Sequence, residues 1–355
     1  MSSQNIVQEF ATGTLQLKVY RAEMPPEELF GFAERENPKR AFLFVSKVLG
    51  RHIPVAPSVM RSIWRLLAAR IETMPGRLTL FVGMAETAIG LAAGVFRECR
   101  KTRDALFLAD TRHVFAAPVL ATFTEDHSHA VRHTLYQPKD IDLRKQPVHL
   151  VAIDDEMTTG QTFQHLRHAL AAAGLDIARF TRAVITDWSN EADTRTSLLK
   201  GAWDWQWRQP PSPPAQRQYP KASDVKISAR QDWGRLGARS LDLAPWPEIH
   251  VSPSSRVLVL GSGEFVWPPF LLAERLEEEG AQVRYAATTR SPIKTGMAIR
   301  SKVEFADNYG LGIPNYLYNV HPDDFDAIFL CVETGREAVS PLLLNALRKA
   351  VVLEY

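Results

Sequence analysis

The chain has 355 residues, of which 45% are hydrophobic and 23% are charged, and its formal net charge is +2. This length favours two domains, and the near-neutral charge gives no electrostatic reason to expect nucleic acid or a membrane as a partner. The longest apolar run, Leu80–Phe96, is interrupted by Glu86, and the N-terminus lacks the pattern of a signal peptide. The two cysteines, Cys99 and Cys331, are expected to be buried free thiols, and we expect a cytoplasmic protein.

Strand and helix signals alternate through the first 207 residues. Such alternation predicts an α/β domain with a parallel sheet that helices cover on both faces. The helical stretches are Val59–Thr73 and Thr87–Arg100. The strand candidates are Ala41–Val45, Leu78–Val82, Ala105–Leu108, His149–Ile153 and Arg182–Thr186.

A proline-rich segment, residues 208–222, divides the chain because it can form neither a helix nor a central strand. We therefore predict a first domain at 1–207, a linker at 208–225 and a second α/β domain at 226–355. The second region begins with a strand at Arg256–Leu260, a helix at Pro268–Gly280 and a strand at Gln282–Ala287.

The segment Val148–Thr162 contains the most informative motif. An apolar run ends in two adjacent acids, Asp154 and Asp155, and a hydroxyl-rich turn, Thr158–Thr162, follows them. A turn at the N-terminus of a helix offers backbone N–H groups to a phosphate, and the two acids can accept hydrogen bonds from neighbouring sugar hydroxyls. The pattern therefore suits a phosphorylated ribose. Helical spacing follows at Phe163, Leu166, Ala169 and Leu170.

This segment resembles the binding motif for 5-phosphoribosyl pyrophosphate (PRPP) of type I phosphoribosyltransferases. The resemblance implies that fold, a Rossmann-like parallel sheet with a hood, and an enzyme that transfers 5-phosphoribosyl from PRPP to an acceptor. Asp154 and Asp155 would be catalytic, Mg²⁺ would arrive with PRPP rather than in a protein metal site, and the loop after the strand at 78–82 would bind pyrophosphate. The implied PRPP-binding residues are Thr158, Thr159, Gly160, Gln161 and Thr162, with Gly83, Met84, Ala85, Glu86 and Thr87.

The resembled fold also has a mobile loop that carries cations over the site. Residues 109–140 occupy that place, and a role for Arg132 or a histidine is favoured over a metal site at His127 and His129. Near the N-terminus, Lys47 and Arg51 are candidate cations for pyrophosphate or the acceptor.

Three positions bear on the acceptor. Thr158 stands where purine-salvage members have an aspartate, so a hypoxanthine or guanine acceptor is disfavoured. Glu156 stands at a place that is usually apolar in the resembled motif. It is either a solvent-facing residue or a local acid or base. Trp188 could stack on an aromatic acceptor, although a packed tryptophan is the commoner case.

Nearly the whole chain outside the linker resembles a narrower family, the phosphoribosyltransferase of tellurium-resistance-type stress operons with its C-terminal TRSP domain. The resemblance lies in residues 35–50, the segment 125–129 and the tetrapeptide 289–292. It implies that the product is a ribosylated, nucleoside-like metabolite. Alternatives are a PRPP sensor without catalysis and, less well supported, a pyrophosphokinase; a homodimer is possible. The candidate residues of the second domain, for a ligand or for docking of a partner, are Gly261, Gly263, Glu264, Thr289, Arg290 and Ser291.

Overall fold

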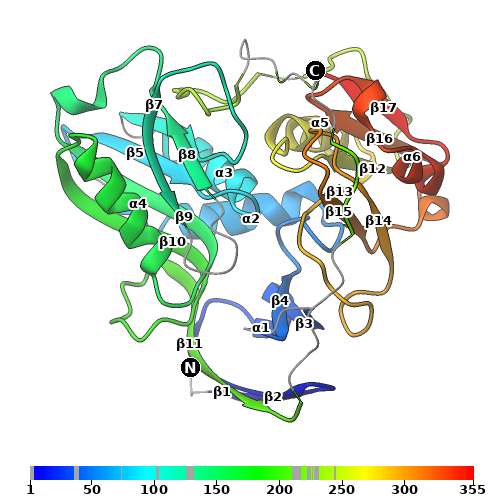
Figure 1. Ribbon diagram of the computed structural model, residues 1–355, viewed down its shortest axis with the longest axis horizontal. Helices are drawn as coiled ribbons and strands as arrows, with labels where there is room; N and C mark the ends of the chain where they lie inside the picture. Colours follow the sequence, from blue (N-terminus) through cyan, green and yellow to red (C-terminus); the bar gives the residue numbers. More distant parts are fainter. Residues whose placement is uncertain are drawn as a thin grey trace.

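The computed structural model describes residues 4–35, 40–72, 74–100, 104–124, 132–209, 217–221, 225, 227, 232–243 and 245–355. Its larger sheet has seven strands (Figure 1). They lie in the order β1 (Gln4–Phe10), β2 (Gly13–Ala22), β11 (Ser197–Trp207), β10 (Ile177–Asp187), β9 (Val148–Met157), β5 (Leu78–Gly83) and β6 (Ala105–Ala109).

The five strands from β11 to β6 run parallel, as the sequence predicts, and β1 and β2 add an antiparallel edge. The chain leaves β5 towards β6 on one side and returns to β9 on the other. The winding direction therefore reverses between β5 and β9. Open α/β sheets bind ligands beyond the carboxyl ends of the strands at such a point.

Helices cover both faces of this sheet. α3 (Ile89–Cys99) contacts β5, β6 and β9, and α2 (Pro57–Ala68) packs on α3. α4 (Gln161–Ala172) contacts β10 and lies on the opposite side of the sheet (Figure 1). None of the helices in the described part of the chain is long and apolar enough to cross a membrane.

One predicted strand does not join the parallel sheet. The candidate Ala41–Val45 forms β4 (Phe42–Ser46), which pairs antiparallel with β3 (Phe30–Glu34) in a two-stranded sheet of its own, next to the short helix α1 (Pro26–Leu29). The physical reason is aromatic packing. Phe42 lies 5.0 Å from Trp203 of β11, centroid to centroid, and Phe44 lies 4.7 Å from Trp188. We call residues 26–35 and 40–46 the hood.

The predicted loop at 109–140 contains a second hairpin, β7 (Val119–Thr124) and β8 (Arg132–Tyr136). β7 contacts α4, and the ring nitrogen Nδ1 of His165 on α4 lies 3.0 Å from the carbonyl oxygen of Thr124. A short 3-10 helix, Leu143–Lys145, leads from the hairpin to β9.

The smaller sheet has four parallel strands in the order β13 (Gln282–Ala287), β12 (Arg256–Gly261), β16 (Ala327–Val332) and β17 (Val351–Glu354). Its winding direction reverses between β12 and β16. The elements that accompany it are α5 (Trp267–Glu278), α6 (Pro341–Leu347), the hairpin β14 (Lys302–Ala306) and β15 (Pro314–Tyr318), and 3-10 helices at Pro322–Asp324 and Arg336–Ala338.

The two sheets share one layer of helices, because α5 packs on α2 and α3. Trp64 of α2 and Phe270 of α5 are both buried, with ring centroids 4.4 Å apart. After the proline-rich segment the chain runs along the edge strand β6, where Phe107 and Ala238 exchange two backbone hydrogen bonds. Both cysteines are free and buried, as predicted.

Gly94 permits the contact between α2 and α3. A Cβ atom at this position would lie 2.0 Å from Cδ2 of the fully buried Trp64 ring. We expect Gly94→Ala to lower the free energy of unfolding by about 1–3 kcal/mol, because overpacking outweighs the gain of a better helix former. Urea unfolding monitored by circular dichroism measures this.

Gly90→Ala is the matched control on the same helix. The nearest heavy atom to an added Cβ there is a methyl group of Val266 at 3.6 Å, which is an ordinary contact. This variant should be as stable as the wild type or slightly more stable. Equal unfolding midpoints for the two alanine variants would contradict the packing argument.

Candidate functional site

The adjacent acids of the motif lie at the carboxyl end of β9, which extends through Met157, beyond the predicted strand. Asp154 and Glu156 alternate with Asp155 along the strand, and the backbone N–H of Asp155 donates to Oδ1 of Asp154 at 2.9 Å. Desolvation raises the pKa of Asp155, and the nearby Glu156 carboxylate contributes to the rise. The acids are therefore a closely coupled group at the reversal point of the sheet.

The hydroxyl-rich turn forms a cradle in front of α4. Gly160 is the N-cap residue of this helix with φ of 77°, a left-handed conformation that favours glycine. The cradle encloses about 50 Å³ and faces the positive end of the α4 dipole. It suits an anion such as a phosphate. Its lining residues are Asp154, Glu156, Met157, Thr158, Thr159, Gly160, Gln161, Thr162 and Phe163.

The loop Gly83–Thr87 adjoins the acids. The backbone N–H of Met84 donates to the carbonyl oxygen of Ile153 at 3.1 Å, which places this loop directly beside Asp154. The N–H of Ala85 donates to Oδ2 of Asp110 at 3.1 Å, and that carboxylate also contacts Nδ1 of His133 on β8. The loop Gly83–Thr87 and the acids of β9 therefore lie together. Asp110 was missed, because nothing in the sequence near it signals its contact with Ala85.

Arg51 rather than Lys47 reaches the loop Gly83–Thr87. The Arg51 side chain is 3% exposed, and its Nη2 donates to the carbonyl oxygen of Glu86 at 2.7 Å. Its Nη1 lies 3.3 Å from Oε1 of the same glutamate. Lys47 is exposed and donates to the carbonyl oxygen of Glu27 within the hood. Arg132 is exposed at the start of β8, and the adjoining residues 125–131, with His127 and His129, lie outside the described residues.

Arg51 also connects the two sheets. Its Nη1 donates to the carbonyl oxygens of Gly263, at 2.8 Å, and Thr288, at 2.7 Å. These residues follow the carboxyl ends of β12 and β13, which are neighbouring parallel strands. The Nε atom of Arg290 lies 3.7 Å from Oε2 of Glu86. The second-domain segments thus adjoin the first-domain loop at one buried arginine.

The other second-domain candidates have protein partners as well. Gly261 ends β12, Thr289 forms an isolated bridge with Tyr316, and the carbonyl oxygen of Ser291 accepts from the Tyr318 hydroxyl at 2.7 Å. Glu264 accepts hydrogen bonds from the hydroxyl of Thr111 and, at 2.9 Å, from the backbone N–H of Arg112. Of these groups, Glu264 connects the second domain with the segment that follows β6.

Protein side chains fill the reversal point of the smaller sheet. Arg235 donates to both carboxylate oxygens of Glu333, at 2.6 and 2.7 Å, and the Tyr309 hydroxyl donates to the same group at 2.8 Å. The Tyr309 ring stacks on His113 from the first domain, with centroids 4.0 Å apart. The position at which open sheets bind ligands is therefore occupied by an internal ion pair and its partners.

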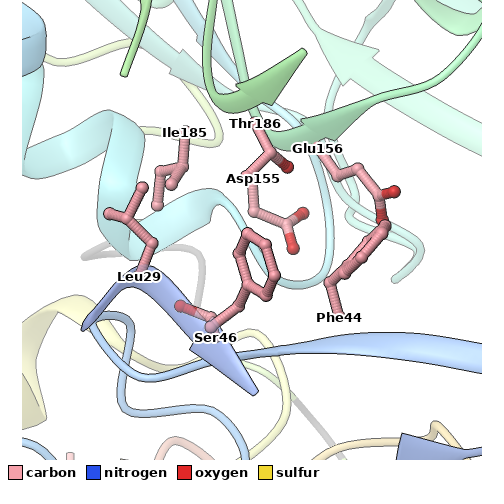
Figure 2. Close-up of a pocket in the computed structure, with 8 residues that line it drawn as sticks. Leu29, Phe44, Ser46, Asp155, Glu156, Ile185 and Thr186 are labelled. Atoms are coloured by element: carbon pink, nitrogen blue, oxygen red, sulfur yellow. The ribbon is translucent and has the colours of Figure 1, made fainter. Parts of the chain in front are cut away.

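A second pocket lies between the acids and the hood (Figure 2). Trp188 is 5% exposed and supports this pocket from behind, because its ring stacks on Phe44 at 4.7 Å. Glu156 lines both this pocket and the cradle, so the two spaces adjoin. We call it the hood pocket; its lining is Leu29, Phe30, Phe44, Ser46, Asp155, Glu156, Ile185 and Thr186.

The buried His52, next to Arg51, should make the stability of the protein depend on pH. Burial lowers the pKa of His52 from 6.5 to about 3, and the charges of Arg51 and Arg35 contribute. The unfolded chain takes up the proton first as the pH falls below 6.5, so stability is complete above that pH and declines below it. Between pH 6 and 5, we expect His52 to lower the free energy of unfolding by about 1.4 kcal/mol per pH unit.

Urea unfolding at pH 7, 6 and 5 measures the decline. His52→Gln should remove this part of the slope, because glutamine does not titrate. His321→Gln, at an exposed position, is the control and should keep the wild-type slope. Identical pH profiles for all three proteins would refute the assignment to His52.

Comparisons with known proteins agree with this geometry. Residues 29–206 match the family described as phosphoribosyl transferase (PRTase_2), and residues 242–347 match the TRSP domain, described as C-terminal to PRTase_2. No curated protein sequence matches the chain significantly.

Solved structures show similarity over part of the chain. Adenine phosphoribosyl transferase from Trypanosoma brucei is 16% identical with a TM-score of 0.33, and the match covers 46% of this chain and 65% of that one. The adenine enzyme from Giardia lamblia is 17% identical with a TM-score of 0.29, and the match covers 37% of this chain and 68% of that one. A hypoxanthine phosphoribosyltransferase from Staphylococcus aureus is 12% identical with a TM-score of 0.28, covering 43% and 77%.

Proposed function

The chain belongs to the phosphoribosyl transferase family, and on this premise we propose that it transfers 5-phosphoribosyl from PRPP to an acceptor and releases pyrophosphate. The observation that carries the proposal is the meeting of three features at one sheet edge. Asp154 and Asp155 end β9, the cradle Thr158–Thr162 begins α4, and the loop Gly83–Thr87 leaves the neighbouring strand β5. The spacing of these features suits the sugar, the 5-phosphate and the pyrophosphate of one PRPP molecule.

In the proposed reaction, the bond between the sugar carbon C1 and the pyrophosphate oxygen breaks, and its electron pair leaves with pyrophosphate. A lone pair of the acceptor forms the new bond to C1. Asp154 and Asp155 hold the 2- and 3-hydroxyls and stabilise the positive charge that develops on the sugar. The cradle holds the 5-phosphate, and Arg132, the first residue of β8, remains the proposed cation over the site.

The donor set at the site fits Mg²⁺ that arrives with PRPP. Asp154 and Asp155 offer carboxylate oxygens, which this ion prefers, beside the cradle and the loop Gly83–Thr87. When bound, Mg²⁺ would offset the negative charge of the leaving pyrophosphate. The residues of this chain orient the sugar between the cradle and the hood pocket.

The hood pocket is the proposed place of the acceptor. It contains Asp155 and adjoins the cradle through Glu156, so an acceptor there lies next to the sugar of a bound PRPP. Its walls of Phe30 and Phe44 suit a flat ring. The second domain then acts on the site indirectly, by fixing the loop Gly83–Thr87 through Arg51.

We assign residues 1–207 to the transferase domain, 208–225 to the linker and 226–355 to the TRSP-like domain; the ranges of the two family matches support this division. We further propose that the product is a ribosylated metabolite linked to tellurium resistance or stress. We place this activity in the cytoplasm, and a homodimer is compatible with the proposal.

Two measurements test the function. Isothermal calorimetry with PRPP and Mg²⁺ should show saturable binding to the full-length protein. Addition of a protein-free metabolite extract should then cause PRPP-dependent release of pyrophosphate. Absence of PRPP binding would refute the proposal, and binding without turnover in any extract would instead identify a PRPP sensor.

A further inference from the structure

The hood pocket is lined by acids, hydroxyls and apolar groups. Asp155 and Glu156 contribute carboxylates, and Ser46 and Thr186 contribute hydroxyls. Figure 2 shows the carboxylate of Glu156 next to the Phe44 ring and the carboxylate of Asp155 directed towards the hood. Among the described residues that line the pocket there is no lysine or arginine. An anionic acceptor would therefore meet two carboxylates and no cation among the groups that line the pocket.

Arg40 is the cation that approaches this wall, and Glu156 holds it. Its Nη2 donates to Oε1 of Glu156 at 2.7 Å, and its Nη1 donates to Oε2 at 3.2 Å. The guanidinium carbon lies 4.6 Å from the ring centroid of Phe42 and 5.6 Å from that of Trp203. A bidentate pair on an aromatic support is a rigid arrangement, so Glu156 is fixed at the edge of the pocket.

The pocket walls favour a flat acceptor. Phe44 stacks on Trp188 with an interplanar angle of 22°, and the ring centroids of Phe30 and Phe44 lie 4.9 Å apart. The stacked pair forms a stiff aromatic wall across from the carboxylates. An aromatic ring against this wall would present its edge to Glu156, and a carboxylate accepts hydrogen bonds but cannot donate them.

We propose that Glu156, held by Arg40, selects the acceptor: a flat heteroaromatic molecule without a negative charge, whose ring edge carries an N–H donor. The proposal rests on the proposed function and names its substrate class. Glu156 binds the N–H group. The two carboxylates of the pocket, Asp155 and Glu156, outnumber the one guanidinium that approaches it, Arg40, and so disfavour aromatic carboxylates. The sequence leaves two interpretations of Glu156, a solvent-facing residue and a local acid or base. The ion pair with Arg40 instead gives Glu156 a role in specificity.

The charge of the acceptor can be tested before its identity is known. A protein-free metabolite extract is separated on an anion exchanger at pH 7, and the unretained and retained fractions are each assayed for PRPP-dependent pyrophosphate release. We expect turnover with the unretained fraction. Turnover confined to the retained fraction would overturn the acceptor class while leaving the transferase intact. Lack of turnover with the whole extract would contradict the transferase itself.

Glu156→Gln tests the residue, with the active fraction as substrate and PRPP binding as the measure of folding. Loss of a hydrogen bond to a charged group should raise the apparent KM for the acceptor by about 10–100-fold. Glu156 also lines the cradle, so the Kd for PRPP is measured beside it, and the KM for the acceptor should change more than this Kd. Glu156→Asp, which keeps the charge, should recover part of the affinity, and Glu248→Gln, at an exposed position, is the control. An unchanged KM in Glu156→Gln would refute the role of this residue.

Discussion

Replacement of Arg51 by methionine is expected to lower the free energy of unfolding by about 3–5 kcal/mol. The substitution would leave the 7% exposed Glu86 without its ion-pair partner Arg51. It would also remove the donor that the carbonyl oxygens of Gly263 and Thr288 share. Buried groups that lose their partners bear the full cost of their desolvation, so this variant should exceed any exposed substitution in its effect.

Urea unfolding of the full-length protein measures the loss of unfolding free energy. Two further variants test its cause. Arg51→Met/Glu86→Gln should recover a large part of the stability, because it removes the buried carboxylate that Arg51→Met leaves with only the more distant Arg290 at 3.7 Å. Lys47→Met is the control, since Lys47 is exposed and donates only to a carbonyl oxygen of the hood. If the double variant were less stable than Arg51→Met, the ion pair would not be the source of the effect.

The same substitution should also weaken PRPP binding. Arg51 holds the carbonyl oxygen of Glu86 in the loop Gly83–Thr87, and the loop lies beside Asp154. A loop released from Arg51 has to be ordered again when pyrophosphate binds. Calorimetry with PRPP, on those variants that remain folded at low temperature, measures this loss of affinity. It therefore tests whether the contact between the sheets affects PRPP binding by the first domain.

The local part of the site could be predicted from the sequence. The apolar run, the adjacent acids and the turn Thr158–Thr162 specify a strand end and a helix start within fifteen residues. Parallel strands place their carboxyl ends at one edge, so the loop Gly83–Thr87 could be expected beside Asp154. The signal in each case comes from neighbours along the chain.

The remaining part depends on contacts that are distant in sequence. Arg51 binds oxygens more than two hundred positions away, and an arginine between a glycine and a histidine gives no sign of such partners. The strand at 42–46 reads like the buried strands of the parallel sheet, yet it joins the hood because its phenylalanines pack on Trp188 and Trp203. Periodicity indicates a strand, but not which sheet it joins.

The glycine turn of the second domain is another pattern whose partner could not be predicted from the sequence. The turn at 261–264 lies at the carboxyl edge of a parallel sheet, where a ligand site was a reasonable expectation. Glu264 instead binds Thr111 and Arg112, and Arg235 pairs with Glu333 at the reversal point. Since a glycine turn favours any anionic or carbonyl partner, the pattern cannot distinguish a ligand from another part of the same chain.

Asp154→Asn/Asp155→Asn should reduce kcat/KM for PRPP by about a thousandfold or more. Both side chains line the site, Asp155 in the hood pocket and Asp154 in the cradle. An amide keeps the shape of each carboxylate but removes the negative charge that stabilises the sugar cation. It also accepts fewer hydrogen bonds from the two ribose hydroxyls, so PRPP binding should weaken as well. Pyrophosphate release and calorimetry measure the two effects separately.

The single variants divide these effects between the acids. Because desolvation raises the pKa of Asp155, its charge is costly in the free protein and is stabilised when positive charge develops beside it. Asp155→Asn should therefore reduce kcat more than it weakens PRPP binding, whereas Asp154→Asn, next to the cradle, should act more on binding. Asp204→Asn, at an exposed position on β11, is the matched control and should keep wild-type kinetics. Full activity in the double variant would show that the adjacent acids end a strand and do not contact the sugar.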